Sequence, residues 1–586
     1  MLRRRVHLTL TEKPTLEGEH EDFIQILTPE GRQVADMDFS YSPLQEELVM
    51  LDAEVVHSDG RRVRLSPDEI RDAGDAPIAD YPGSRRKFFS LPGVIPGAVV
   101  HVRYRREWRD YPMPYVALGL PLGDEVEIVE ASVEVTVPRG ASFHFERDRV
   151  PDAEPRVQQT PHGTTYAWQF RELPAVPVEE LSPPGPPPSL RISTWPDWRA
   201  YQEWCGRVIR RSRELTPELS AKAAELTRGA RTDLEKVRAV YHYVADLRYV
   251  MVPLGVNSYR PHAAAGVLRN QFGDCKDKAN LFNALLDALG LEASLVLVPR
   301  FSQVSPTLPG EGLNHAISRV RLGADTLWVD TTDAECPFGL LPPGDAGRRV
   351  LVVDGPSAGL TALPDPSPDD HRLELQTDLD WPAPGQPARL SVRAKAAGFP
   401  DYEWRRMAAR PGVRRGHEAL IDPAWRLSAG EFVLAQQRFT PPSRLEEPFG
   451  WEAGGECLGL TSRSEYGQLC RVPFWIPREW GLALQPRAGP LHLNQGYPLR
   501  LVQSVRLSLP ATGRMKGLPA LAENTVPPLR WKLDWVRGVD ATLEGRLEVE
   551  LVRGDIPFPE VATVQRQVRD CLEALANAVV SATPSP

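Results

Sequence analysis

The chain has 586 residues, of which 42% are hydrophobic and 25% are charged, and its formal net charge is -9. This length is too great for one hydrophobic core, so we expect several domains, and the apolar content is sufficient to fill them. Because the net charge is negative and no basic block could follow a phosphate backbone, nucleic acid is not an expected partner. The sequence predicts no membrane span, since it has no apolar run of about 18 residues.

The cysteines do not form a disulfide framework. They are Cys205, Cys275, Cys336, Cys457, Cys470 and Cys571. They include no CxxC pair and are too sparse for the disulfide pattern of a small secreted domain. The basic start MLRRRVHLTL is followed by too short an apolar stretch for a signal peptide. We therefore expect a cytoplasmic protein, or a periplasmic or secreted one if a leader has been removed.

Residues 1–173 alternate apolar and polar side chains with a period of two. Val100, Val102 and Tyr104, for example, alternate with histidine and arginine. Turn signals such as Ser58-Asp59-Gly60 separate the alternating segments at short intervals. The pattern predicts an N-terminal antiparallel β-sandwich.

A proline-rich segment, residues 174–193, follows this region. Its prolines cannot continue a helix or a β-ladder, so we predict an extended linker. Residues 194–364 then begin with helical patterns. A first helix is expected at 195–211, a second with Thr216-Pro217 as N-cap and first helical residue, and a third that opens with the capping box of residues 232–235.

Alternation returns in residues 365–586 and predicts a C-terminal β-domain. Near the end, residues 560–580 carry one apolar stripe at helical spacing, which predicts a terminal amphipathic helix. Such a helix packs on its own sheet far more often than on a membrane or a partner.

A cysteine lies at the predicted start of a helix within YRPHAAAGVLRNQFGDCKDKANLFNALLDALGLEASLVLVPR, residues 259–300. Apolar residues recur at helical spacing after Cys275, Gly290 ends the pattern, and residues 291–298 form a compact apolar strand. Asp274 suits the N-cap, which places Cys275 at the first helical position. Unpaired backbone N–H groups and the helix dipole there favour the thiolate over the thiol.

The sequence GLNHAISRVRLGADTLWVDTT further along predicts a β-hairpin. If Gly323-Ala324 is a two-residue turn, Asp330 lies opposite Ile317 and diagonal to His315, with both polar side chains on one face. Taken singly, His315 is an ordinary strand histidine, Asp330 starts a turn, and Cys275 is a core residue. Together they fit a site in which an imidazole takes the thiol proton and a carboxylate orients the imidazole.

The segments GDCKDKANLFNALLDALGLEASLVLV, NHAISRV and LWVDTTD resemble the transglutaminase-like superfamily. More narrowly, the chain is similar to bacterial proteins in which an N-terminal β-domain of unknown function precedes that papain-like core and a C-terminal β-domain follows it. The resemblance implies that Cys275 is the nucleophile, His315 the base and Asp330 the orienting carboxylate. Lys276 stands where eukaryotic transglutaminases carry an aromatic residue, so protein cross-linking is not implied.

We therefore predict an α+β multidomain protein. It has the N-terminal antiparallel β-sandwich, a central papain-like, transglutaminase-like α+β core and the C-terminal β-domain with its terminal helix. The predicted enzyme attacks an amide or peptide carbonyl through a Cys275 thioester, in acyl transfer or hydrolysis, and its expected substrate is a protein or peptide. The alternative is a non-catalytic peptide- or protein-binding scaffold that keeps the core fold and presents its flanking β-domains to a protein partner.

No metal or other cofactor is expected. His242 and His262 have no second ligand at metal-binding spacing, and no calcium loop of alternating acidic residues occurs. Cys336, shortly after the predicted carboxylate, is interpreted as a spectator and not as a second reactive thiol.

The charges around the cysteine suggest further roles. Lys276 and Lys278 are candidates to stabilise the thiolate, although positions i and i+2 on a helix point apart and only one of them can face the cleft. The backbone N–H of Cys275 is one expected donor to an oxyanion, and Asn257 and Tyr259 are candidates for the second.

Overall fold

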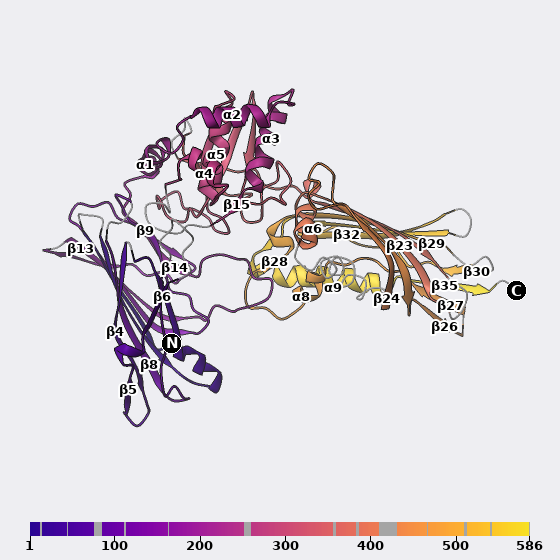
Figure 1. Cartoon of the computed structure of the whole chain (residues 1–586). Coiled ribbons are helices and arrows are strands. Elements are labelled where there is room, and N and C mark those ends of the chain that lie inside the picture. The colour runs from indigo at the N-terminus through magenta and orange to yellow at the C-terminus, as the bar shows by residue number, and fades with distance from the viewer. Residues whose placement is uncertain are drawn as a thin grey trace. The chain divides into compact units, whose positions relative to one another are not determined.

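The computed structural model describes residues 1–11, 15–43, 45–74, 85–109, 113–161, 163–250, 260–354, 359–381, 386–409, 431–465, 467–508, 513–538 and 542–584. The chain forms two compact, strand-rich units (Figure 1). Unit 1 comprises Met1–Pro177, Gly185–Thr332 and Arg349–Ala362. Unit 2 comprises Val178–Pro184, Asp333–Arg348 and Leu363–Pro586. Within the described ranges, no helix is both long and apolar enough to cross a bilayer.

The large sheet of unit 1 has the strand order β12-β13-β10-β1-β2-β8-β4-β5. Its strands are β1 (Arg3–Leu10), β2 (Leu16–Gln25), β4 (Glu46–Val56), β5 (Arg62–Arg64), β8 (Val99–Trp108), β10 (Ile128–Val137), β12 (Arg156–Thr160) and β13 (Gly163–Leu173). As the alternation predicts, Val100 and Val102 are buried whereas Arg103 is exposed. The pairing of β1 with β10 is parallel, and this one pair departs from the antiparallel pairing predicted for the sandwich. These strands are distant in sequence, and no tight turn sets their relative direction.

Two small sheets pack against the apolar face of the large sheet. They have the orders β3-β7-β6 and β11-β14-β9. Their strands are β3 (Asp36–Tyr41), β6 (Arg71–Gly74), β7 (Arg85–Ser90), β9 (Ala117–Pro121), β11 (His144–Asp148) and β14 (Ser189–Ser193). Phe89 packs in one core with Val100, and Leu190 packs in the other with Trp168, which gives the predicted sandwich. The last residues of the predicted linker are therefore strand β14, because Leu190 and Ile192 are buried between β9 and β11.

The remainder of unit 1 is an α+β core. Its helices are α1 (Trp198–Arg210), α2 (Pro217–Leu226), α3 (Asp233–Asp246), α4 (Ala264–Asn270) and α5 (Cys275–Asp287). Its sheet, of order β19-β18-β17-β20-β21, is built from β17 (Ala293–Val298), β18 (His315–Leu322), β19 (Asp325–Val329), β20 (Arg349–Val352) and β21 (Leu360–Ala362). A two-stranded sheet pairs β15 (Arg248–Tyr249) with β16 (Phe272–Gly273). The predicted caps are confirmed, since Thr216 accepts from Leu219 N–H and Thr232 forms a capping box with Glu235.

Helix α5 is the centre of this core. It contacts α2, α3 and α4 as well as strands β17 and β18 (Figure 1). Phe282 and Leu285 are completely buried. The residues that follow the polar first turn of α5 are therefore apolar where they face these neighbouring elements. A helix fixed by so many neighbours holds its first residue in a defined position.

Unit 2 is built on a second eight-stranded sheet of order β24-β25-β23-β22-β29-β33-β32-β31, and the predicted alternation again marks its strands. They are β22 (Arg372–Asp380), β23 (Ala388–Ala397), β24 (Glu431–Phe439), β25 (Gly450–Leu458), β29 (Leu499–Ser508), β31 (Ala522–Asn524), β32 (Leu529–Arg537) and β33 (Thr542–Leu551). Smaller sheets contain β26 (Thr461–Ser464), β27 (Gly467–Arg471), β28 (Leu491–His492), β30 (Gly513–Gly517), β34 (Asp555–Ile556) and β35 (Val579–Pro584). The helices are α6 (Phe399–Ala409), α8 (Arg478–Ala483) and α9 (Phe558–Ala576), and short 3₁₀ turns across the chain are η1 (Pro29–Ala35), η2 (Pro67–Glu69), η4 (Pro368–Asp370) and η5 (Asn494–Gly496).

Helix α9 is the predicted terminal helix, and it packs on β31 and β32 of its own sheet (Figure 1). Val561, Val564 and Val568 of the predicted stripe are buried. The predicted end at residue 580 is wrong, because the helix stops at Ala576 and Val579 begins β35, which pairs with β27 and β30. The apolar stripe continues smoothly from helix into strand, so periodicity alone does not mark the boundary.

Candidate active site

The start of α5 is held by a reciprocal cap. Asp274 Oδ1 accepts from Asp277 N–H at 3.2 Å, and Asp277 Oδ2 accepts from Asp274 N–H at 3.4 Å. Gly273 is required here, because a Cβ atom at this position would lie 2.7 Å from the Cβ of Asp277. Cys275 is the first helical residue, as predicted. It is partly exposed, while the residues next to it in the chain are buried.

The other polar residues of GDCKDK secure the helix to its neighbours. Lys278 is fully buried and donates to the carbonyl oxygens of Ala245 and Leu247, at 3.0 and 2.8 Å, where α3 ends. The Lys276 ammonium pairs with Asp274. Only Lys276 lines the cavity beside the cysteine, in agreement with the expectation that the two lysines point apart.

His262 also supports the start of helix α5. Asp277 accepts from His262 N–H at 2.8 Å and pairs with His262 Nδ1 at 2.9 Å. The side-chain hydrogen bond with Asp277 raises the pKa of His262 above its ordinary value. The carboxylate therefore ties the loop before α4 to the first turn of α5.

The β18–β19 hairpin has the predicted register, since Leu322 pairs with Asp325 and Ser318 with Val329. His315 Nε2 lies 2.9 Å from Asp330 Oδ2, and both side chains are buried. Asp330 Oδ1 accepts from Thr332 N–H at 2.8 Å and from Thr332 Oγ1–H at 2.7 Å. An ionised carboxylate only accepts, so Nε2 is the donor to Asp330.

Electrostatics keep Asp330 ionised. Burial alone would raise the pKa of Asp330, but His315, and after it Arg300 and Thr332, hold that pKa well below the usual range for a carboxyl group. Arg300 Nη2 lies 3.6 Å from Asp330 Oδ2. The Asn314 side chain fixes the Arg300 backbone by accepting from its N–H at 2.7 Å and donating to its carbonyl at 3.0 Å. The arrangement places a permanent positive charge beside the buried carboxylate.

Cys275 and His315 line the same cavity, of about 100 Å³. The structure thus brings the three predicted site residues together, His315 with Asp330 by direct contact and His315 with Cys275 across this cavity. The imidazole therefore pairs with a carboxylate and shares a cavity with the thiol.

Two residues near the site were not predicted from the sequence, Arg300 and Tyr249. Tyr249 pairs with Gly273 in the β15–β16 register, two residues before Cys275. Tyr249 as a residue is 42% exposed, but partial desolvation of its hydroxyl, together with the neighbouring Cys275 and Asp274, raises the pKa of Tyr249. Sequence spacing offers no signal for either residue, because both reach the site through strand pairing and loop geometry. The earlier candidates for an oxyanion donor, Asn257 and Tyr259, lie outside the described residues.

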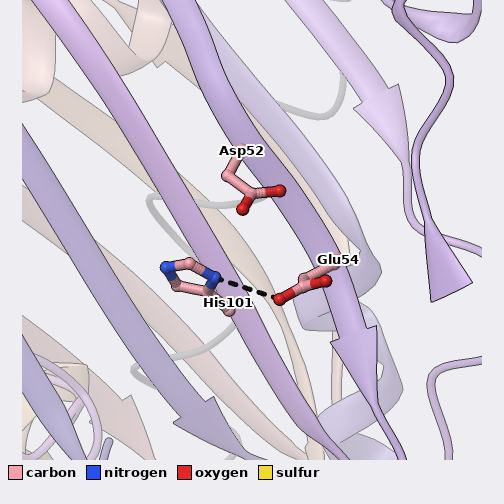
Figure 2. A group of neighbouring side chains, drawn as sticks. All are labelled: Asp52, Glu54 and His101. Carbon is pink, nitrogen blue, oxygen red and sulfur yellow. Dashed lines mark ion pairs between the residues drawn. The ribbon is translucent and has the colours of Figure 1, made fainter. Parts of the chain in front are cut away.

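A cluster of Asp52, Glu54 and His101 lies on the charged face of the large N-terminal sheet (Figure 2). Glu54 accepts from Arg62 at 3.0 Å and from Arg64 at 3.1 Å. His101 Nδ1 lies 3.5 Å from Glu54, and its Nε2 lies 3.0 Å from Glu21. These donor atoms already serve a cross-strand ionic network, so the cluster fits a structural role better than a metal site.

The remaining sequence candidates lie in their own surroundings. Cys336 is part of unit 2, where it is buried in a cluster with Phe399, Tyr402 and Tyr497. His242 is on α3 and contacts the ring of Tyr241.

Comparisons with known proteins identify two domains in this chain. Residues 14–177 match the model of a domain of unknown function (DUF3857), and residues 220–331 match the model of the transglutaminase-like superfamily. A search of curated proteins found no match.

Solved structures match this chain, and two of them are described as proteases. A "putative protease" from Parabacteroides distasonis ATCC 8503 has a TM-score of 0.71 at 14% identity, over 99% of this chain and 98% of that chain. A "putative cysteine protease" from Cytophaga hutchinsonii covers 54% of this chain and 76% of that chain at 12% identity, but its TM-score of 0.17 supports no conclusion. The first likeness shows a shared fold along nearly the whole chain. The protein therefore carries a transglutaminase-like core, preceded by a DUF3857 domain and followed by a C-terminal β region with its own helix.

Proposed function

We propose that this protein is a cysteine enzyme that cleaves or transfers an acyl group at an amide or peptide carbonyl. The observation that carries the proposal is the pairing of His315 with Asp330 at 2.9 Å beside a cavity that Cys275 also lines. Such a pairing fixes the imidazole tautomer and orientation, which a thiol nucleophile needs.

The first half-reaction forms a thioester. His315 takes the proton of the Cys275 thiol, the sulfur attacks the carbonyl carbon, and the C–N bond breaks as the imidazolium returns its proton to the leaving amine. Because Nε2 is engaged by Asp330, Nδ1 is assigned to this proton exchange. Asp330 stays ionised and stabilises the imidazolium.

Stabilisation of the tetrahedral intermediate is assigned to two donors. One is the backbone N–H of Cys275 at the start of α5, where the helix dipole favours negative charge. The other is the hydroxyl of Tyr249, held by strand pairing beside Gly273. In the second half-reaction, water or an amine attacks the thioester with His315 as base, so hydrolysis and transfer share one site.

Thiol alkylation tests the proposal directly. All cysteines other than Cys275 are buried, so iodoacetamide should label Cys275 selectively in the folded protein. At about pH 6.5 a free thiol reacts slowly, whereas a thiol activated by an imidazole reacts fast. We expect rapid labelling of the wild type, slow labelling of His315→Asn, and wild-type labelling of the control His242→Asn.

The opposite result would favour a different class of function. If Cys275 reacts as slowly as a free thiol in all three proteins, the site is not an activated nucleophile. The core would then be a peptide- or protein-binding scaffold without catalysis. For an active enzyme, the ratio of hydrolysed to amine-transferred product with an added primary amine separates hydrolase from transferase.

A further inference from the structure

The cavity beside Cys275 has a mostly apolar wall. Helix α1 contributes one face with helical spacing, and strand β17 contributes alternate residues of one side. These residues are Tyr201, Trp204, Cys205, Ile209, Leu295 and Leu297. Ala316, opposite Leu297 in the β17–β18 pairing, adds a small side chain.

The polar residues that line the cavity are engaged elsewhere. The Lys276 ammonium pairs with Asp274. The Asn314 amide holds both backbone groups of Arg300. In the described part of the cavity wall, Lys276 and Asn314 are thus already engaged and are not available to pair with a charged ligand. Burial of an unpaired charge in this cavity would be costly.

Cys205 contributes volume and not reactivity. It is buried within the core cluster against which Cys275 also packs. Burial raises the pKa of Cys205 to about 12, so its thiol stays protonated and acts as a small apolar group. The size of this side chain therefore helps to determine how large a group the cavity accepts.

The volume limits the occupant further. A dry cavity of about 150 Å³ lined by aliphatic and aromatic side chains accommodates benzene. The cavity here, at about 100 Å³, has room for a branched chain of a few carbons and is smaller than the cavity that accommodates benzene.

We propose that this cavity binds a small branched aliphatic group of the acyl donor, of the size of a valine or leucine side chain. The inference rests on the proposed function and narrows its substrate class. The acyl group takes part in both half-reactions, because its bond to sulfur forms in the first and breaks in the second, whereas the leaving amine departs in the first. A pocket lined by Cys275 itself therefore holds the acyl group throughout and orients its carbonyl toward the helix N-terminus.

A series of acyl p-nitrophenyl esters tests this acyl preference, because the esters differ only in the acyl group and share one leaving group. The wild type is acylated with the acetyl, isovaleryl, phenylacetyl and succinyl esters, and the thioester on Cys275 is followed by mass and by p-nitrophenolate release. Each rate is divided by the rate of a free thiol, N-acetylcysteine. Since each methylene in an apolar pocket changes specificity by roughly tenfold or more, isovaleryl should exceed acetyl by at least roughly tenfold. It should also exceed phenylacetyl and succinyl.

Two substitutions of Cys205 should change, in opposite directions, the size of the acyl group that the cavity accepts. Cys205→Ala should raise the phenylacetyl rate relative to isovaleryl by roughly tenfold, and Cys205→Leu should remove the preference for isovaleryl over acetyl. Cys571→Ala, which truncates an equally buried helical cysteine in unit 2, is the control and should keep the wild-type order. If a Cys205 variant fails to fold, the wild-type series alone still decides.

The possible results distinguish failure of the aliphatic pocket from failure of the proposed cysteine enzyme. Equal normalised rates for all four esters, or a fastest succinyl or phenylacetyl ester, would overturn the aliphatic pocket and leave the cysteine enzyme standing. No acylation of Cys275 by any ester would overturn the proposed function, and the pocket assignment with it.

Discussion

The substitution Asp330→Asn alters the site through one hydrogen bond. Asp330 Oδ1 accepts two hydrogen bonds from Thr332, so the asparagine oxygen has to stay at that position. The amide nitrogen then faces His315 Nε2 in place of Oδ2. Because an amide NH₂ only donates, Nε2 must become the acceptor and the ring proton moves to Nδ1. This is the nitrogen assigned to receive the Cys275 proton, so the base is lost although its position is kept.

The expected loss of activity is much larger than the expected loss of stability. Fixing the wrong imidazole tautomer in such a triad lowers turnover by about ten-thousand-fold, which corresponds to about 5.4 kcal/mol in the barrier. Asparagine keeps the shape and the Thr332 contacts, so the cost in folding free energy is that of one hydrogen bond to a charged group, about 1.5–3 kcal/mol. The variant should therefore be folded and inactive.

The assay is acylation and hydrolysis of the isovaleryl p-nitrophenyl ester, with urea denaturation in parallel. Asp287→Asn is a matched control, because it weakens the pair of Asp287 Oδ1 with Arg213 Nη2, 2.7 Å apart, at the far end of α5. The control should lose stability without a comparable loss of turnover. If folded Asp330→Asn retains more than about a tenth of the wild-type rate, the assigned roles of His315 and Asp330 are wrong.

Three further changes test individual contacts. Tyr249→Phe should lower ester turnover by about 10²–10³, as loss of an oxyanion donor does; equal turnover would exclude the hydroxyl as a donor. Lys278→Met should reduce the free energy of unfolding by about 1–3 kcal/mol for each of the two carbonyl groups left without this donor, and an unchanged urea midpoint would contradict this. The hydrogen bond with Asp277 raises the pKa of His262, so their pair stabilises the fold fully below about pH 6.5 and less as the pH rises through the raised pKa. The stability difference between wild type and His262→Gln should therefore be larger at about pH 6 than at about pH 9, and a difference independent of pH would count against the charged pair.

Much of the site could be predicted because its components are local. Asp274 caps a helix whose first residue is Cys275, and the cap requires only residues within one turn. The hairpin register follows from a two-residue turn at Gly323-Ala324, and this fixes which strand face carries His315.

Other features depend on contacts between distant segments. The parallel pairing of β1 with β10 follows from no pattern in either strand. Arg300 reaches Asp330 through a loop that Asn314 holds in place, and Tyr249 reaches the helix start through the pairing of β15 with β16. None of these contacts leaves a periodic signal in the sequence.

The sequence by itself determined the elements and the chemical groups of this protein, because periodicity, caps and turns act over a few residues. It identified a thiol at a helix start, an imidazole and a carboxylate on one hairpin, and strand-rich regions on either side. Only the tertiary structure decided what surrounds the thiol. The apolar cavity is formed where α1, α5 and β17 meet, and its size depends on how side chains such as Cys205 and Leu297 pack together.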